Sequence, residues 1–312
     1  MTGLLISPSG LRIPFRRYYY TKEYCEKKGR PYRKQTQLAA EMIRELPLPE
    51  GADVVVLGDT AFDAEVIRQA SDERHYSWIV PLNPERVLAG AKPRPKVKSL
   101  VKGLKAKQFQ PVRLYPGQGR YAAMRRVSAY RLGPKVKPRT YYVHPESRAV
   151  HSVGNVLLVF STRTNPQAGP ELDVQKILMT NNVDLTAAEV VELYDLRWQI
   201  ELFFKELKST MGFDQYRFRR FESVEGWVDM ALATFLYLEW HRARQLQRRD
   251  LLDAEKDRWR RQRTHGLCAA MRQETEQADL TYVAEAVQTQ NGIRRLRRKL
   301  RDVIQNEYRL VP

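Results

Sequence analysis

Short apolar runs dominate the first half of the chain, and a helical period dominates the last third. Between Gly3 and Phe15, two apolar runs flank the segment Ser7-Pro8-Ser9-Gly10, whose residue types favour a tight turn. This pattern predicts a β-hairpin. Apolar residues then recur with helical spacing from Gln35 to Leu46 and stop before a proline, which predicts a helix there.

A strand–helix–strand pattern follows. The continuous apolar run Val54–Leu57 predicts a strand that is buried on both faces. Residues Ala61 to Glu73 have helical periodicity, and Trp78-Ile79-Val80 predicts a second short strand, closed by Pro81. Strands that alternate with helices indicate an α/β sheet.

The pattern changes after this unit. Asn83 to Lys107 is rich in Pro and Lys, which is typical either of a solvated loop or of an arm that contacts DNA. Phe109 to Ser161 alternates strand-like runs with Gly and Pro turns, which predicts a mostly-β insertion. The expected strands are Tyr121–Tyr130, Thr140–His144 and Val156–Phe160, followed by Gln175–Thr180. From Thr186 to the end we expect helices, with breaks near Gly212, Gly266 and Gly292.

The charge of the chain changes the functional picture. Lys and Arg outnumber Asp and Glu by 54 to 36, for a net charge of +18, while hydrophobic residues make up 43% and are sufficient for a core. A basic balance favours polyanionic partners, although many basic proteins bind nucleic acid only loosely. No apolar run approaches the roughly 18 residues of a membrane span, and no signal peptide opens the chain. We expect a cytoplasmic, nucleoid-associated protein that binds nucleic acid.

Metal sites made of Cys or His are not indicated. The two cysteines lie far apart, and no two histidines have the spacing of a helical metal site. The histidines are His75, His144, His151, His241 and His265.

The segment Thr186 to Met211 is the most informative one. Thr186 and Glu189 form a capping-box pair at its start. At about 100° per residue, Tyr194, Arg197, Glu201 and Lys208 fall within roughly 60° of one helix face. Trp198 and Lys205 lie beside that face, and the apolar residues Leu196, Ile200, Phe203 and Leu207 lie on the other side.

Two interpretations of this face are open. It can be the solvated side of an ordinary amphipathic helix. However, a carboxylate among cations and aromatic rings also suits a metal ion beside a DNA phosphodiester. Arg and Lys would then hold phosphate oxygens, the carboxylate would hold the cation, and the rings would stack on bases.

The spacing Tyr194-x2-Arg197-x3-Glu201-x6-Lys208 resembles the Tyr-Arg-Glu-Lys signature of bacterial insertion-sequence DDE transposases. Leu178-Met179-Thr180-Asn181 resembles the strand that precedes this helix in that family. The resemblance extends from about Gly3 to about Arg244 and implies an RNase H-like α/β core with an inserted mostly-β subdomain and a helical C-terminal region. It divides the chain into core residues 1–82, a linker and insertion at 83–180, a second core segment at 181–250, and a basic helical region at 251–312.

Asp59 is the second candidate metal ligand, beside Glu201. It follows the Val54 strand, and ligands of open α/β sheets bind beyond the carboxyl ends of strands. Asp59 can also be a helix N-cap, and Asp63 is a weaker alternative ligand. The resemblance implies that Asp59 and Glu201 are catalytic and bind Mg²⁺ or Mn²⁺.

The third carboxylate of the family pattern has no counterpart. No Asp precedes Asp53, and Asp53 begins the strand that Asp59 ends, which would place the two about 20 Å apart. We therefore expect an amino-terminally truncated chain that lacks the first strand of the core, with a gap between the hairpin and the Val54 strand. Two carboxylates bind a pair of metal ions poorly, so we expect little strand cleavage by this chain alone.

The expected partner is double-stranded DNA, both transposon ends and target. The candidate DNA contacts are Tyr194, Arg197, Trp198, Lys205 and Lys208, with Arg294, Arg295 and Arg298 in a second basic cluster. Such arginines can equally serve helix solubility. A homodimer or a pairing with full-length transposase would fit the resemblance. The alternative function is an inactive DNA-binding or dimerising fragment that inhibits transposition.

Overall fold

The computed structural model describes residues 1–90, 92–115, 120–121, 124, 138–168, 172–247, 277–278, 280–295 and 298. The chain forms two compact units, Met1–Leu236 and Tyr237–Pro312. The domain limits expected from the sequence stay predictions.

The amino-terminal hairpin has the predicted form. Strand β1 (Thr2–Ile6) pairs antiparallel with β2 (Arg12–Arg16). The turn closes with a hydrogen bond from the Gly10 amide to the Ser7 carbonyl (2.8 Å), and Gly10 takes a φ of 80°, which glycine adopts without strain. Among the described strands, β1 and β2 form a sheet of their own, so the expected separation from the Val54 strand is present.

The second sheet has six strands in the order β3-β4-β8-β7-β6-β5. Their bounds are β3 Val55–Leu57, β4 Ser77–Pro81, β5 Gln110–Leu114, β6 Arg139–Val150, β7 Gly154–Thr162 and β8 Lys176–Thr180. Strands β3 and β4 are parallel, and the other neighbours pair antiparallel. The sheet is therefore mixed rather than parallel.

Both faces of the central strands are covered. On β4, Trp78 and Val80 belong to one apolar cluster, which also includes Val97 of α4 (Val97–Gly103). The intervening Ile79 belongs to a second cluster on the other face, with Val190 of α5 (Ala187–Asp195). Two-sided burial explains why β4, β7 and β8 are continuous apolar runs.

Strand β3 matches the prediction in part. Its three residues are only half-buried, and it pairs with β4 alone among the described strands. Val56 packs against apolar clusters on one face, and Val55 and Leu57 pack against the cluster on the other, so both faces are covered as expected, but only in part.

The strands of the expected insertion are part of the same sheet. Strand β7 pairs with β8, with Leu158 opposite Met179, and β8 in turn pairs with β4. An inserted subdomain that folds separately stays a prediction. Most of the strand expected at residues 121–130 lies outside the described residues. The Pro- and Lys-rich segment 83–107 contains the helix α4 and a bridge between Val87 and Lys96, so it is more than a loop.

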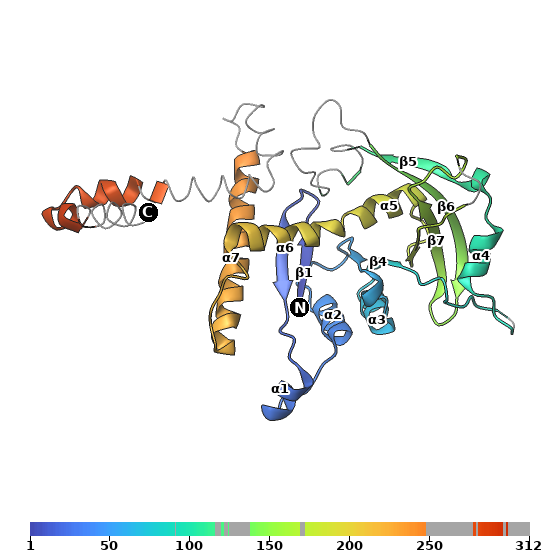
Figure 1. The fold of residues 1–312 in the computed structure, drawn as a ribbon, viewed down its shortest axis with the longest axis horizontal. Coiled ribbons are helices and arrows are strands. Elements are labelled where there is room, and N and C mark those ends of the chain that lie inside the picture. The colour runs from blue at the N-terminus through green and yellow to red at the C-terminus, as the bar shows by residue number, and fades with distance from the viewer. Residues whose placement is uncertain are drawn as a thin grey trace, which may run out of the picture. The chain divides into compact units, whose positions relative to one another are not determined.

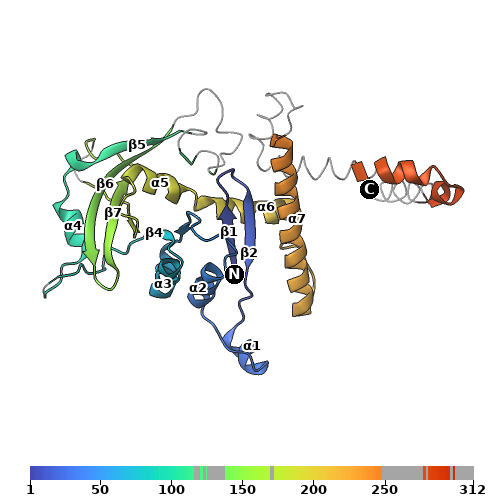
Figure 2. The same ribbon diagram turned by 180° about the vertical axis from the view of Figure 1, so that it is seen from behind.

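Helices α2 (Gln35–Arg44) and α3 (Glu65–Glu73) pack against each other and lie side by side in both views (Figure 1 and Figure 2). Their contact is a small apolar cluster that includes Ala40, Ile43 and Ala70. The predicted helix 61–73 starts with a separate 3-10 turn, η1 (Thr60–Phe62). The remaining short helices are α1 (Lys22–Lys27) and η2 (Ala106–Gln108).

The helix predicted over Thr186–Met211 is divided. Helix α5 ends at Asp195, α6 runs over Trp198–Met211, and only a short turn separates them (Figure 1). In that turn the Leu196 backbone amide donates to Leu193 O (2.9 Å), and the Arg197 backbone amide donates to Tyr194 O (3.0 Å). This is the tighter hydrogen-bond spacing of a 3-10 helix. The prediction of a single continuous helix was therefore wrong. The rotation of about 100° per residue that placed Tyr194 and Glu201 on one face applies only within α5 and within α6, not across the turn between them.

A buried ion pair holds α6 against the hairpin. The Arg12 guanidinium of β2 donates to Glu206 Oε2 of α6 at 2.6 Å, and both side chains are buried. The same guanidinium lies 5.0 Å from the ring centroid of Phe235, on α7 (Phe221–Gln247). Phe235 in turn meets Phe203 of α6 edge-on, at 4.7 Å between centroids. These contacts fix α6 in the first unit.

The described part of the second unit is helical. It comprises the end of α7 and helical residues at 280–286 and 290–295. The helix is interrupted at residues 287–289, close to the break expected near Gly292, and Gly266 lies outside the described residues. In the part of the chain that the structure describes, no helix combines the length and apolarity needed to cross a membrane.

Candidate active site

Asp59 lies where the β3 strand ends. The preceding Gly58 amide donates to Ile79 O of the parallel strand β4 (3.2 Å). A Cβ at Gly58 would lie 3.1 Å from the Phe62 Cβ and 3.2 Å from the Val80 Cγ1, so this close approach favours glycine. The chain therefore turns sharply and leaves Asp59 exposed at the edge.

Asp59 is also a cap. Its Oδ1 accepts a hydrogen bond from the Ala61 amide (2.9 Å) at the start of η1. The two interpretations of the sequence are thus compatible, because the capping contact fixes the carboxylate at the carboxyl end of the strand. One oxygen positions the group, and the exposure of the side chain keeps it accessible to a ligand.

Asp63, the alternative ligand, is engaged elsewhere. Its side chain is 7% exposed, and its Oδ1 pairs with the guanidinium of Arg68. Its Oδ2 accepts from Arg86 Nη2 (2.9 Å) and Nε (3.1 Å). Two guanidinium groups therefore take up both oxygens of Asp63.

Glu201 lies in the first turn of α6 and is half-exposed. Arg197 Nη2 donates to its Oε1 at 2.7 Å. The amino end of the helix and the adjacent guanidinium both place positive charge beside this carboxylate.

Tyr194 connects the two carboxylates. Burial raises the pKa of its hydroxyl above the ordinary value, Arg197 opposes that rise, and the charges of Asp59 and Glu201 add to it. Both carboxylates therefore act electrostatically on one side chain. Asp59 and Glu201 lie 142 positions apart in the numbering (201 − 59), and that their two carboxylates share one site stays a prediction.

Lys176 is a member of this neighbourhood that the sequence did not indicate. Its Nζ lies 5.1 Å from the Tyr194 ring centroid, and burial, with the charge of Arg197, lowers the pKa of this ammonium. It is the first residue of β8, the strand whose Leu178–Asn181 segment was singled out. No spacing rule relates it to the helix, so only folding could identify it.

The exposed side of α6 carries the remaining candidates. Lys205 and Lys208 are exposed, and the Trp198 ring is 50% exposed. Glu201 and these two lysines line an open pocket of about 600 Å³ together with Asp214. Asp214 is a further carboxylate that sequence reasoning missed, and it follows Gly212, whose φ of 61° ends the helix.

The donor set suits one hard divalent cation better than two. Asp59 and Glu201 supply carboxylate oxygens, the ligands that Mg²⁺ and Mn²⁺ prefer. Among the residues that the structure describes, no three acidic, His or Cys side chains gather closely enough to hold a metal ion. That Asp59 and Glu201 hold a single ion stays a prediction, and Arg197 would then share Oε1 of Glu201 with that ion.

The second basic cluster lies in the other unit. Arg294, Arg295 and Arg298 are helical and exposed. Their side chains can reach a polyanion, but a joint role with α6 stays a prediction.

The chain resembles one protein family in its central part. Residues 32–237 match the family model described as "Transposase DDE domain". The match includes Asp59, Tyr194 and Glu201, and it leaves out the amino-terminal hairpin and the cluster near Arg294. No curated protein sequence matches the chain significantly. The mixed α/β architecture with its six-stranded sheet is compatible with an RNase H-like domain of this kind.

Proposed function

The chain belongs to the transposase DDE-domain family, and from this premise we propose that it binds DNA along α6 and holds a divalent cation with Asp59 and Glu201. The reaction class is cleavage and transfer of DNA strands in transposition. The observation that carries the proposal is the family match, which includes both Asp59 and Glu201, together with the exposed Lys205 and Lys208 that line one pocket with Glu201.

The side chains around this pair support phosphate binding. Lys205 and Lys208 project from α6 beside Glu201, so they can contact successive phosphates of a strand. Arg197 donates to Glu201 and can offer its other N–H groups to a phosphate oxygen. The half-exposed Trp198 ring offers a surface on which a base can stack.

A cation held by the two carboxylates would supply charge stabilisation to a phosphodiester under attack. Mg²⁺ and Mn²⁺ are the ions whose ligand preference fits this pair. Since no third acidic side chain gathers with the two carboxylates among the residues that the structure describes, we expect only weak strand cleavage.

That same observation favours a second candidate function. A chain that binds DNA and one metal ion but cleaves DNA slowly would occupy transposon ends or pair with active transposase. In either way it would inhibit transposition. The two candidates share the DNA-binding surface and differ in the rate of cleavage.

Titration of the full chain with Mn²⁺, followed by electron paramagnetic resonance of the free ion, tests the metal site directly. We expect about one tight ion per chain, weakened at least about tenfold by either Asp59→Asn or Glu201→Gln, because each removes one of two charged ligands. Asp184→Asn is the matched control, since Asp184 is an exposed acid outside the site. This variant should bind Mn²⁺ with the same affinity as the unmodified chain.

Two results would overturn the proposal. One is Mn²⁺ binding that survives both ligand substitutions. The other is duplex DNA binding that is unchanged in a chain with Lys205→Ala and Lys208→Ala. Rapid Mg²⁺-dependent nicking that is lost in Glu201→Gln would instead remove the inhibitor candidate and establish the enzyme.

A further inference from the structure

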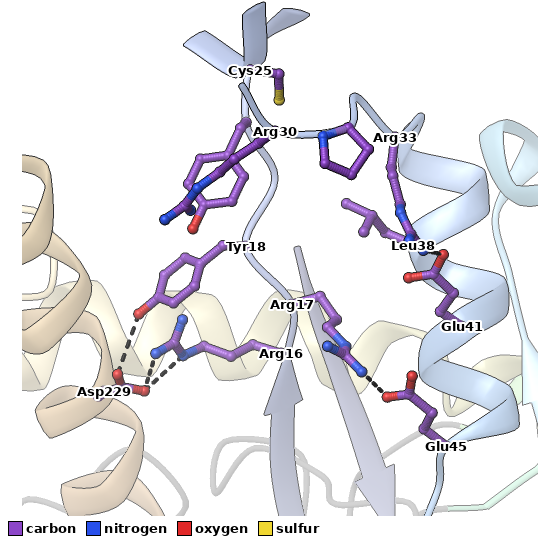
Figure 3. A pocket seen from close by; sticks show the side chains of 12 residues that line it. Arg16, Arg17, Tyr18, Cys25, Arg30, Arg33, Leu38, Glu41, Glu45 and Asp229 are labelled. Atoms are coloured by element: carbon purple, nitrogen blue, oxygen red, sulfur yellow. Dashed lines mark hydrogen bonds and ion pairs between the residues drawn. The ribbon is translucent and has the colours of Figure 1, made fainter. Parts of the chain in front are cut away.

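A second pocket, of about 740 Å³, lies in the first unit and shares no lining residue with the candidate active site. Its walls come from the end of β2, from the segment around α1, and from α2 and α7, as Figure 3 shows. Its volume is in the range of small-molecule sites. The lining residues are Arg16, Arg17, Tyr18, Tyr20, Cys25, Arg30, Pro31, Arg33, Leu38, Glu41, Glu45 and Asp229.

The acids in this pocket are already paired. Arg16 Nε donates to Asp229 Oδ1 (2.8 Å), Arg17 pairs with Glu45, and Arg33 pairs with Glu41. Each guanidinium has five N–H groups, so a single carboxylate leaves donors available to a further anion. Figure 3 shows these ion pairs on two sides of the pocket.

Arg30 differs from the other three arginines. It is exposed, and no ion pair joins it to a carboxylate among the residues that the structure describes. Its guanidinium lies 5.3 Å from the Tyr20 ring centroid. Gly29, with a φ of 61°, and a hydrogen bond from the Arg30 amide to Cys25 O (2.9 Å) fix the backbone at this position. The pocket therefore keeps one net positive charge among its lining residues, next to an aromatic ring.

The tyrosines are held rigidly. The Tyr20 ring stacks on Tyr24 (5.2 Å between centroids, 12° between planes), and its hydroxyl donates to Glu225 Oε1 (2.9 Å). Tyr18 donates to Glu225 O (3.0 Å), and the Arg16 guanidinium covers its ring at 3.7 Å. Tyr24 stacks on the Tyr20 ring and the Arg30 guanidinium also lies over it, so a base meets this ring at its edge or after Arg30 turns toward a phosphate.

We propose that this pocket binds one unpaired nucleotide of a DNA strand, with its phosphate on Arg30 and Arg17 and its base against Tyr20. Guanidinium groups bind phosphates through paired, charge-assisted hydrogen bonds, and aromatic rings bind bases whatever their sequence. Bases inside a duplex are stacked and paired, so their faces cannot enter a pocket of this kind. The choice of DNA as the polymer rests on the proposed function, whereas the recognition of a phosphate and a base rests on the pocket alone.

The test is fluorescence anisotropy of a labelled short oligothymidylate with the full chain, in EDTA so that the metal site makes no contribution. We expect Arg30→Ala to weaken binding about tenfold, the loss typical of one charge-assisted hydrogen bond. Lys28→Ala is the matched control, because it removes the same charge from an exposed residue two positions away that does not line the pocket. Its effect should be about twofold or less, and Arg30→Lys should fall between the two.

Competition distinguishes a nucleotide from a bare phosphate. Unlabelled oligothymidylate should displace the probe much better than tripolyphosphate at equal phosphate concentration, and a blunt duplex should compete poorly for the Arg30-dependent component. Equal losses from Arg30→Ala and Lys28→Ala, or equal competition by tripolyphosphate, would refute the nucleotide pocket.

Failure of the active-site proposal would look different. In that case Asp59→Asn and Glu201→Gln would leave Mn²⁺ binding unchanged, while Arg30-dependent binding of oligothymidylate in EDTA would persist. The reverse pattern would leave the metal site standing and remove the nucleotide pocket.

Discussion

Asp63 and Asp59 lie four positions apart, and the structure assigns them opposite consequences on mutation. Asp63→Ala removes the carboxylate that faces Arg68 and Arg86, whereas Asp59→Asn removes a charge from an exposed cap. The Arg68 side chain is 7% exposed, and burial lowers the pKa of its guanidinium while the Asp63 charge raises it. Without Asp63, Arg68 keeps a buried charge that has lost its acidic partner.

The magnitude follows from burial. Removal of one partner from a buried ion pair typically costs about 3–5 kcal/mol, because the remaining charge is desolvated without compensation. Arg86 is 27% exposed and can turn toward water. Loss of its pair with Asp63 should therefore lower the free energy of unfolding by at most about 1 kcal/mol. We therefore expect Asp63→Ala to lower the free energy of unfolding by about 3–5 kcal/mol. Asn caps a helix about as well as Asp, so Asp59→Asn should keep the cap and cost less than about 0.5 kcal/mol.

Urea unfolding at neutral pH, followed by tryptophan fluorescence, measures both variants, since Trp78 lies beside Arg68 with its ring centroid 6.0 Å from the guanidinium. Mn²⁺ titration of the same samples measures the metal affinity of each variant. Asp63→Ala should retain metal affinity in the folded fraction and lose stability, and Asp59→Asn should do the reverse.

A paired substitution provides the control. Asp63→Leu combined with Arg68→Met leaves no buried charge at this position and should recover much of the lost stability. A loss below about 1 kcal/mol for Asp63→Ala, or an equal loss for Asp59→Asn, would refute the distinction between a structural and a ligand carboxylate.

Three further predictions address the helices and one surface loop. Thr186→Ala removes the hydroxyl that accepts from the Glu189 amide and should cost about 1 kcal/mol in a denaturant titration, whereas Thr186→Ser should cost much less. Phe203→Ala empties a fully buried position of α6 and should cost about 3–5 kcal/mol by the same measurement; a loss under about 1 kcal/mol would contradict the assigned packing. Hydrogen bonds from Lys96 and Lys98 lower the pKa of Glu85 from an ordinary 4.5 to about 2, so its contribution to stability should be complete above about pH 4.5 and disappear as the pH falls toward 2. Carboxyl NMR titration should show this depressed pKa, and Lys98→Met should raise it toward 4.5.

The sequence by itself determined the local elements. The Ser7–Gly10 turn, the Thr186 cap and the Gly212 terminus depend on neighbouring residues only, so residue type was enough to predict them. The resemblance drawn from the Tyr194–Lys208 spacing indicated a DDE transposase, and the match over residues 32–237 confirmed that family, while the Tyr-Arg-Glu-Lys signature stays a prediction.

Only the tertiary structure decided how these elements meet. It placed β8 between β4 and β7, left β3 at an edge, and tightened the turn at Leu196 between residues that individually favour helix. It also brought Lys176 to Tyr194 and Arg16 to Asp229, which is 213 positions away. Contacts of this range depend on which apolar faces are buried together, and periodicity shows that a face is apolar without showing which partner covers it.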